Sequence, residues 1–213
     1  MKQTIPAMRS VIPVTLLLTL FGQILPKTAL AGTDFSQVCA KAVHAAEIVN
    51  QLPRRLLHAV SLTESGRWND KAEAAIAWPW TINAGGKGKF FRTKDEALAE
   101  VRRLQSQGIS NIDVGCMQIN LQYHGHVFQN IENAIDPINN VAYAATFLKD
   151  LRLKSGSWAH AVGRYHTSNW KGRGKDYWRR VRTFWTTEKL RDFRARRAAR
   201  IEKNRRKQVA AQH

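Results

Sequence analysis

One carboxylate of this chain ends an apolar stripe, a position where it could act as an acid. Leu57, Val60 and Glu64 recur at helical spacing, and Pro53 suits a first helical position, which needs no N–H donor. Glu64 is therefore expected to point to the same side as the apolar residues. Loss of water around a carboxylate favours its protonated form and raises its pKa. Such a group can donate a proton to a leaving oxygen, which is the step that glycoside cleavage requires.

The alternative for Glu64 is a solvated carboxylate at a helix end, paired with a nearby arginine such as Arg54 or Arg67. From residue type alone this is the commoner situation, because carboxylates with perturbed pKa values are the minority. A second segment favours the chemical interpretation. Residues 115–120 read Gly-Cys-Met-Gln-Ile-Asn, and Gln118 within them is difficult to explain as core. We therefore expect this segment to form the floor of a cleft beside the acid.

Four segments in this order resemble the sequence elements of the soluble lytic transglycosylase (SLT) family. Residues 58–66 contain its Glu-Ser-Gly element, and residues 115–120 resemble Gly-Leu-Met-Gln. Residues 140–148 resemble its Asn-hydrophobic helix, and residues 161–166 its Ala-Tyr-Asn element. The family consists of lysozyme-like enzymes that cut peptidoglycan between N-acetylmuramic acid and N-acetylglucosamine. Any one element would be a weak signal, but four in order are a strong one.

The resemblance also implies roles for individual residues. Glu64 stands at the catalytic position. Substrate-binding or positioning roles are implied for five further residues: Ser65, Met117, Gln118, Asn120 and Tyr165. For Met117 and Tyr165, ordinary core packing is the alternative, because such side chains also fill gaps between elements. The chain departs from the family pattern at Cys116, Arg164 and His166, which replace a Leu, a small residue and an Asn.

A second carboxylate leaves two mechanisms open. Residues 113–120 also resemble an Asp-containing segment of animal-type lysozymes, so Asp113 is a candidate nucleophile or charge stabiliser. A retaining hydrolase needs its two carboxyls roughly 5 Å apart, and an inverting one roughly 6.5–9.5 Å. The transglycosylase mechanism needs only Glu64, first as acid and then as base, and closes a 1,6-anhydro ring on the muramic residue. We favour the latter because three elements agree with it together. The alternative for Asp113 is a loop carboxylate that accepts turn hydrogen bonds.

The first 31 residues are predicted to be a secretory signal peptide. Lys2 and Arg9 form a positive start, Val11 to Leu25 are largely apolar, and residues 29–31 read Ala-Leu-Ala before Gly32. The apolar run contains Pro13 and is too short to favour a permanent membrane span. No stable span is expected after cleavage. Together with the family resemblance, this predicts a periplasmic protein.

Two cysteines in an extracytoplasmic protein invite pairing. A Cys39–Cys116 bridge would join the first helix of the mature chain to the cleft floor. Two buried free thiols are the alternative, because cysteine is among the most buried residue types. The seven histidines lack ligand spacing with cysteine or acidic partners, so no metal site and no cofactor are expected.

The length that remains after the signal peptide is enough for one catalytic domain and a tail. We expect a mainly α, lysozyme-like (α+β) domain over residues 32–187. Helices are predicted after the caps Asp136, Ser157 and Thr93. An insertion at about residues 70–112 should contain a small β-hairpin around Gly85-Gly86. Its tryptophans, residues 78 and 80, would stack on sugar faces or cover core.

The remaining residues, 188–213, form a basic tail, predicted to be disordered or a solvated helix. The chain holds 34 Lys or Arg against 16 Asp or Glu, and residues 171–213 contribute sixteen against four. The tail could bind anionic envelope material or an acidic partner, such as an envelope-spanning secretion or flagellar assembly. A merely solvated tail is the alternative.

Two other functional classes are compatible with parts of the sequence. The basic tail with Trp178, Phe184 and Trp185 would suit a nucleic-acid-binding protein, but a signal peptide argues against it, so no specific nucleic acid is expected. A non-catalytic glycan-binding or assembly scaffold is the third class, and the presence of Glu64 argues for activity. The predicted function is that of a peptidoglycan lytic transglycosylase, with local wall opening for an envelope machine as its context.

Overall fold

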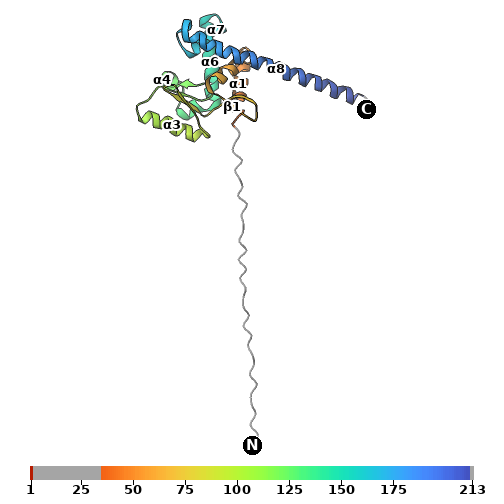
Figure 1. Cartoon of the computed structure of the whole chain (residues 1–213). Coiled ribbons are helices and arrows are strands. Elements are labelled where there is room, and N and C mark those ends of the chain that lie inside the picture. Colours follow the sequence, from red (N-terminus) through yellow and green to blue (C-terminus); the bar gives the residue numbers. More distant parts are fainter. Residues whose placement is uncertain (2–34, 212–213) are drawn as a thin grey trace. The chain divides into compact units, whose positions relative to one another are not determined.

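The computed structural model of this chain describes Met1 and residues 35–211. The predicted signal peptide lies almost entirely outside these residues. Within the described residues, no helix is both long and apolar enough to cross a membrane. Residues from 35 onward are mainly helical and carry two small antiparallel sheets, as Figure 1 shows. The mainly α, lysozyme-like (α+β) fold predicted from the sequence is confirmed.

Eight α-helices, two short helical turns and six strands make up the described residues. The α-helices are α1 (Val38–Val49), α2 (Leu56–Ser65), α3 (Lys94–Ser106), α4 (Leu121–His124), α5 (Ile131–Ile135), α6 (Pro137–Ser155), α7 (Trp158–His166) and α8 (Lys175–Ala210). The short turns are η1 (Gly125–Val127) and η2 (Trp170–Gly174). The strands are β1 (Gly66–Asn69), β2 (Ala74–Ala77), β3 (Thr81–Ala84), β4 (Lys87–Phe90), β5 (Ile112–Val114) and β6 (Ile119–Asn120).

The helical core forms where α2 is enclosed by other helices. Leu57 and Val60 of α2 are fully buried with Val43 of α1, Val141 of α6 and Val181 of α8. α8 packs on α2 and α7, and α6 packs on α1 and α7. The apolar stripe of α2 is therefore covered on several sides, and its last turn carries Glu64.

A second core lies between the four-stranded sheet and α3. The strands follow the order β4-β3-β5-β6, all antiparallel. The hairpin predicted around Gly85-Gly86 is formed by β3 and β4, and the helix predicted after Thr93 is α3. Trp78 and Trp80 are 8% and 5% exposed and belong to this core. They cover core, so the hypothesis that they stack on sugar faces is not supported.

Local capping accounts for three of the helix starts. Asp136 accepts hydrogen bonds from the N–H groups of residues 138 and 139, Ser157 from that of residue 160, and Thr93 from that of residue 96. Each satisfies donors that the first turn of a helix leaves without partners. These three predicted caps are confirmed.

The start of α2 differs from its prediction. Pro53 is not a helical residue, and the helix begins at Leu56 after Arg55, whose φ is 65°. The buried carboxylate of Glu47, on α1, accepts hydrogen bonds from the backbone N–H groups of Arg55 and His58 at 3.0 and 3.1 Å. A carboxylate at a helix N-terminus also complements the helix dipole. The cap therefore comes from another helix and not from the local sequence.

The predicted boundary at residue 188 falls inside a continuous helix. α8 runs from Lys175 to Ala210, and Glu188 and Asp192 are buried. Residues 193–211 are exposed apart from Glu202. The tail is thus a solvated helix, and its folded neighbour extends to about residue 192.

Candidate active site

Glu64 lies in a cleft together with most of the residues predicted for the site. The cleft has a volume of about 520 Å³. Five predicted residues line it: Glu64, Asp113, Gln118, Asn120 and Tyr165. Glu64 comes from helix α2 and Tyr165 from α7. The other three residues come from the β5–β6 hairpin. The structure therefore brings together segments that are about a hundred residues apart in the sequence.

The Glu64 carboxyl is held by a tyrosine that the sequence did not single out. The Tyr177 hydroxyl, in the first turn of α8, donates a hydrogen bond to Glu64 Oε1 at 2.5 Å. Tyr177 is 1% exposed, and its pKa is well above the ordinary value because burial and the neighbouring carboxylate disfavour the phenolate. It therefore remains a donor. Within residues 35–211, the other carboxyl oxygen, Oε2, has no hydrogen-bond partner.

The environment of Glu64 raises its pKa to about 7. Burial is the largest cause, because it disfavours the charged form. The hydrogen bond from Tyr177 acts in the opposite direction, the negative charge of Asp113 raises the pKa further, and Arg180 lowers it. A carboxyl with this pKa is present in both protonation states near neutral pH. It can donate a proton in one step and accept one in the next.

We expect Tyr177→Phe to move the alkaline limb of the pH–activity profile to higher pH. The hydroxyl stabilises the charged carboxylate, so its removal raises the pKa of Glu64 further, and the acid stays protonated at higher pH. Loss of the positioning contact should also lower kcat by about tenfold. The measurement is kcat/KM between pH 5 and pH 9.

Tyr165→Phe is the matched control for this variant. The Tyr165 hydroxyl donates to the carbonyl of Met117 at 2.8 Å and not to Glu64. Its removal should leave the alkaline limb in place. An equal shift in both variants would contradict the assigned role of Tyr177.

Asp113 is held on both carboxylate oxygens by neighbouring strands. The register of the sheet pairs Asp113 with Asn83 on β3 and with Asn120 on β6. The two amides donate to its oxygens at 3.1 and 2.8 Å. Burial raises the pKa of Asp113, whereas the two hydrogen bonds lower it. The bonded oxygens are more typical of a fixed carboxylate that acts through its charge than of a free nucleophile.

The loop before Gln118 is held by one buried asparagine. The side chain of Asn140, on α6, donates to the carbonyls of Val114 and Ala134 and accepts the N–H of Met117 at 2.9 Å. Gly115 has a φ of +83°, and a Cβ atom there would lie 2.6 Å from the Asn140 amide. Only glycine fits both the conformation and the close approach. This contact fixes the cleft floor to the helical core.

Two predicted site residues lie beneath the cleft and not in its lining. Met117 is fully buried in the helical core, so the prediction that it lines a sugar subsite is replaced by core packing. Ser65 is 1% exposed, and its hydroxyl donates to the carbonyl of Cys116 at 2.7 Å. This bond joins the end of α2 to the cleft floor. Ser65 therefore lies beneath the cleft floor and is not part of the cleft lining.

Cys39 and Cys116 form a disulfide in the structure. Both cysteines are fully buried in the helical core, and 77 positions separate them along the chain. The bridge attaches α1 to the loop between Gly115 and Met117. The cleft floor is thus fixed to the core by a covalent bond as well as by Asn140.

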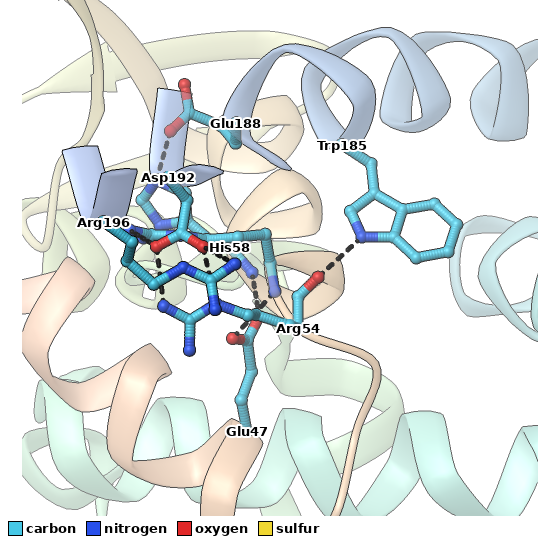
Figure 2. Close-up of polar contacts among 8 residues, drawn as sticks. Glu47, Arg54, His58, Trp185, Glu188, Asp192 and Arg196 are labelled. Atoms are coloured by element: carbon cyan, nitrogen blue, oxygen red, sulfur yellow. Dashed lines mark hydrogen bonds and ion pairs between the residues drawn. The ribbon is translucent and has the colours of Figure 1, made fainter. Parts of the chain in front are cut away.

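A polar network joins α8 to the beginning of α2, as Figure 2 shows. Asp192 accepts two hydrogen bonds from Arg54, both at 2.6 Å, and forms further ion pairs with Arg55 and Arg196. Trp185 Nε1 donates to the carbonyl of Arg54 at 2.8 Å. These contacts hold α8 against the N-terminal end of α2, the helix that carries Glu64.

We expect Asp192→Ala to lower the free energy of unfolding by about 2 kcal/mol near neutral pH, because several arginines lose a buried partner. The arginines lower the pKa of Asp192 to about 2 from 3.8. Its stabilisation is therefore present above about pH 4 and is lost as the pH falls toward 2. Urea unfolding at pH 7 and pH 2.5 measures both effects. Glu202→Ala, which removes only exposed pairs within α8, should change nothing measurable.

Three residues of the site were missed by sequence reasoning. Tyr177 lies within the predicted catalytic domain but in its basic last segment, Asn83 lies in the insertion, and Asn140 opens the segment that resembles the Asn-hydrophobic helix. His166 lines the cleft, and its ring stacks on that of Tyr177 with centroids 4.6 Å apart. The only sequence signal for the buried role of Asn140 is its position as a polar residue next to the apolar stripe of α6. Within the described part of the chain, no cluster of three or more His, Cys, Asp or Glu could hold a metal ion.

Comparison with known proteins identifies the family. Neither the curated proteins nor the solved structures provide a significant match to the chain. The family model described as Transglycosylase SLT domain matches residues 41–176, which is more than half of the chain and includes α2, the β5–β6 hairpin and α7. The chain therefore belongs to the SLT family of lytic transglycosylases, enzymes that act on peptidoglycan in the cell envelope.

Proposed function

We propose that this protein is a periplasmic lytic transglycosylase that cleaves the β-1,4 bond between N-acetylmuramic acid and N-acetylglucosamine with Glu64 as its single catalytic residue. The observation that carries the proposal is the Glu64 carboxyl, which has a pKa of about 7, is held by Tyr177 on one oxygen and lines a cleft. Export through residues 1–31 is part of the proposal.

The protonated Glu64 carboxyl donates its proton to the glycosidic oxygen. The bond between that oxygen and the muramic C1 breaks, and the N-acetylglucosamine residue leaves with the proton on its 4-hydroxyl. The Glu64 carboxylate then accepts the proton of the muramic 6-hydroxyl, whose oxygen bonds to C1 and closes the 1,6-anhydro ring. Glu64 ends protonated, as it began, and no water is consumed.

Other cleft residues are assigned supporting roles. Tyr177 fixes one oxygen of Glu64, so the carboxyl can present Oε2 to the substrate. The charge of Asp113 raises the pKa of Glu64 and stabilises positive charge that develops at the muramic C1. Gln118 and Tyr165 line the sugar subsites. Asn120 holds Asp113 at 2.8 Å and so positions that charge.

A muramidase that uses Glu64 and Asp113 together is the second candidate, because both carboxyls line the same cleft and interact electrostatically. The test is mass spectrometry of the soluble products after residues 32–213 digest peptidoglycan. Glu64-dependent 1,6-anhydromuramyl ends support the proposal. Reducing ends, heavier by one water, would replace it with the muramidase. Absence of products beside an active reference enzyme would overturn both.

Local wall opening during assembly of an envelope-spanning secretion or flagellar machine is the cellular context of the proposal. The single domain and its basic C-terminal helix support a dedicated local role. Loss of assembly in cells that carry Glu64→Gln at normal protein level tests this context.

A further inference from the structure

The second half of α8, residues 193–210, is a helix without a tertiary partner in the described part of the chain. All its residues are exposed except Glu202, and its side-chain hydrogen bonds from residue 197 onward stay within the helix. Figure 1 shows it leaving the elements against which the first half packs. Since helices in water are stabilised mainly by packing, this segment needs another source of stability.

The positive charge of this segment lowers the stability of the isolated helix further. Residues 193–210 contain one acidic residue, Glu202, and eight basic residues. The basic residues are Arg194, Arg196, Arg197, Arg200, Lys203, Arg205, Arg206 and Lys207. Several lie three or four positions apart, such as Arg197 with Arg200 and Arg196 with Arg200. Like charges at these spacings destabilise a helix. Glu202 offsets them through Arg205 and Arg206, and Asp192, just before the segment, pairs with Arg196. An anionic surface would remove the repulsion.

Apolar side chains on one side of the helix indicate which kind of anion fits. Leu190, Phe193 and Ile201 are 47%, 57% and 57% exposed. At about 100° per residue, they lie within a third of the helix circumference and opposite Glu188 and Asp192, which face the domain. Arg197 projects from the same side, between Phe193 and Ile201, and Leu190 precedes the segment, so Phe193 and Ile201 are the apolar side chains that the segment itself presents there. This stripe therefore points away from the folded domain and cannot be covered by it.

We propose that the second half of α8 is a membrane-surface helix that binds a bilayer containing anionic phospholipid. Phe193 and Ile201 enter the acyl boundary, and the arginines beside them keep their charges at the headgroups while their stems cover apolar surface. Nucleic acid would match the charge but would not use the apolar side chains, and binding to protein-free vesicles distinguishes a bilayer from an acidic protein. The proposal concerns a site separate from the cleft and does not depend on the catalytic mechanism.

The experiment is co-sedimentation of residues 32–213 with vesicles. Both cores lie within this segment, and it lacks the apolar run at Val11 to Leu25, which would itself enter a bilayer. We expect binding, at physiological salt, to phosphatidylcholine vesicles that contain about 30% phosphatidylglycerol. We expect no binding to vesicles of pure phosphatidylcholine. Absence of binding to the anionic vesicles overturns the proposal.

Two variants separate charge from insertion. The charge variant replaces Arg194, Arg197, Arg200 and Lys203 with Gln, and should bind about 600-fold more weakly, since each basic residue near an anionic surface contributes roughly fivefold. Phe193→Ser with Ile201→Ser should weaken binding by about tenfold. The matched control replaces four exposed basic residues elsewhere, Lys71, Lys87, Arg92 and Lys149, with Gln and should bind like the wild type.

Equal weakening by the control set would show that net charge alone acts and would overturn a dedicated helix. Unchanged binding of the Phe193 and Ile201 variant, with equal affinity for duplex DNA, would identify a general polyanion site instead. Circular dichroism of each variant checks that the helix persists. Cleavage of soluble glycan should be unaltered in all of them, so a failure here is distinct from a failure of the catalytic proposal.

Discussion

Replacing Glu64 with Gln lowers kcat for glycan cleavage by about 10³-fold or more. The amide retains the shape and one acceptor oxygen for Tyr177, but it can neither donate a proton to the leaving oxygen nor accept one from the 6-hydroxyl. A general acid or base alone contributes about 10²–10⁴-fold, and here both roles are lost together. Release of soluble muropeptides, quantified by chromatography, measures the effect.

Asp113→Asn is the matched control for this prediction. One amide neighbour can still donate to the remaining oxygen, so the substitution removes one hydrogen bond and the charge that raises the pKa of Glu64. We expect a decrease in kcat of about tenfold or less, with the alkaline limb moved to lower pH. A loss as large as that of Glu64→Gln would favour the two-carboxylate hydrolase.

The Glu64→Gln variant should also be more stable than the wild type at alkaline pH. The pKa of Glu64 is about 7 in the folded protein and 4.5 as its ordinary value, so the folded state binds the proton more tightly. The associated stabilisation is complete below about pH 4.5 and is lost as the pH rises through 7. Above that pH the charged carboxylate costs roughly 3 kcal/mol, and Gln removes this cost. Equal urea midpoints for the two proteins at pH 8 would contradict the raised pKa.

Replacing both Cys39 and Cys116 with Ser should lower the free energy of unfolding by about 4 kcal/mol. The disulfide closes a loop between positions that are 77 apart, which removes much of the freedom of the unfolded chain. Two buried hydroxyls would also take the place of sulfur in the apolar core. Urea unfolding of the oxidised wild type and of the double variant measures the difference.

Activity should fall further than stability alone explains. Cys116 lies between Gly115 and Met117, and its carbonyl accepts the hydrogen bond from Ser65. Loosening this loop moves Gln118 relative to Glu64, so kcat should decrease even at temperatures where the variant is fully folded. Dithiothreitol should reproduce both effects in the wild type and leave the double variant unchanged. An unchanged wild-type midpoint in the reduced protein would contradict a stabilising bridge.

Features encoded within a few residues were predictable. The caps at Asp136, Ser157 and Thr93 and the glycine turn of the β3–β4 hairpin depend on neighbouring atoms, and each lies where the sequence indicated. Glu64 and Gln118 were recognisable because polar residues interrupt apolar patterns. Their order along the chain also matched the family elements.

Features that depend on distant segments were not predictable. The start of α2 is set by Glu47 from another helix, and Met117 is buried because Asn140 and the disulfide hold its loop against the core. Tyr177 reaches Glu64 across 113 positions, and no local pattern distinguishes it from other aromatic residues of α8. Such roles follow from packing and not from spacing.

The placement of Tyr177 and Asp192 on one terminal helix affects when the catalytic group is assembled. Glu64 is among the earlier residues of the domain to leave the ribosome, but its hydrogen-bond donor and the residue that fixes α8 are among the last. A chain that ends before residue 175 contains all four family elements and lacks both. The hydrogen bond that holds the catalytic carboxyl therefore forms only after most of the chain has been made.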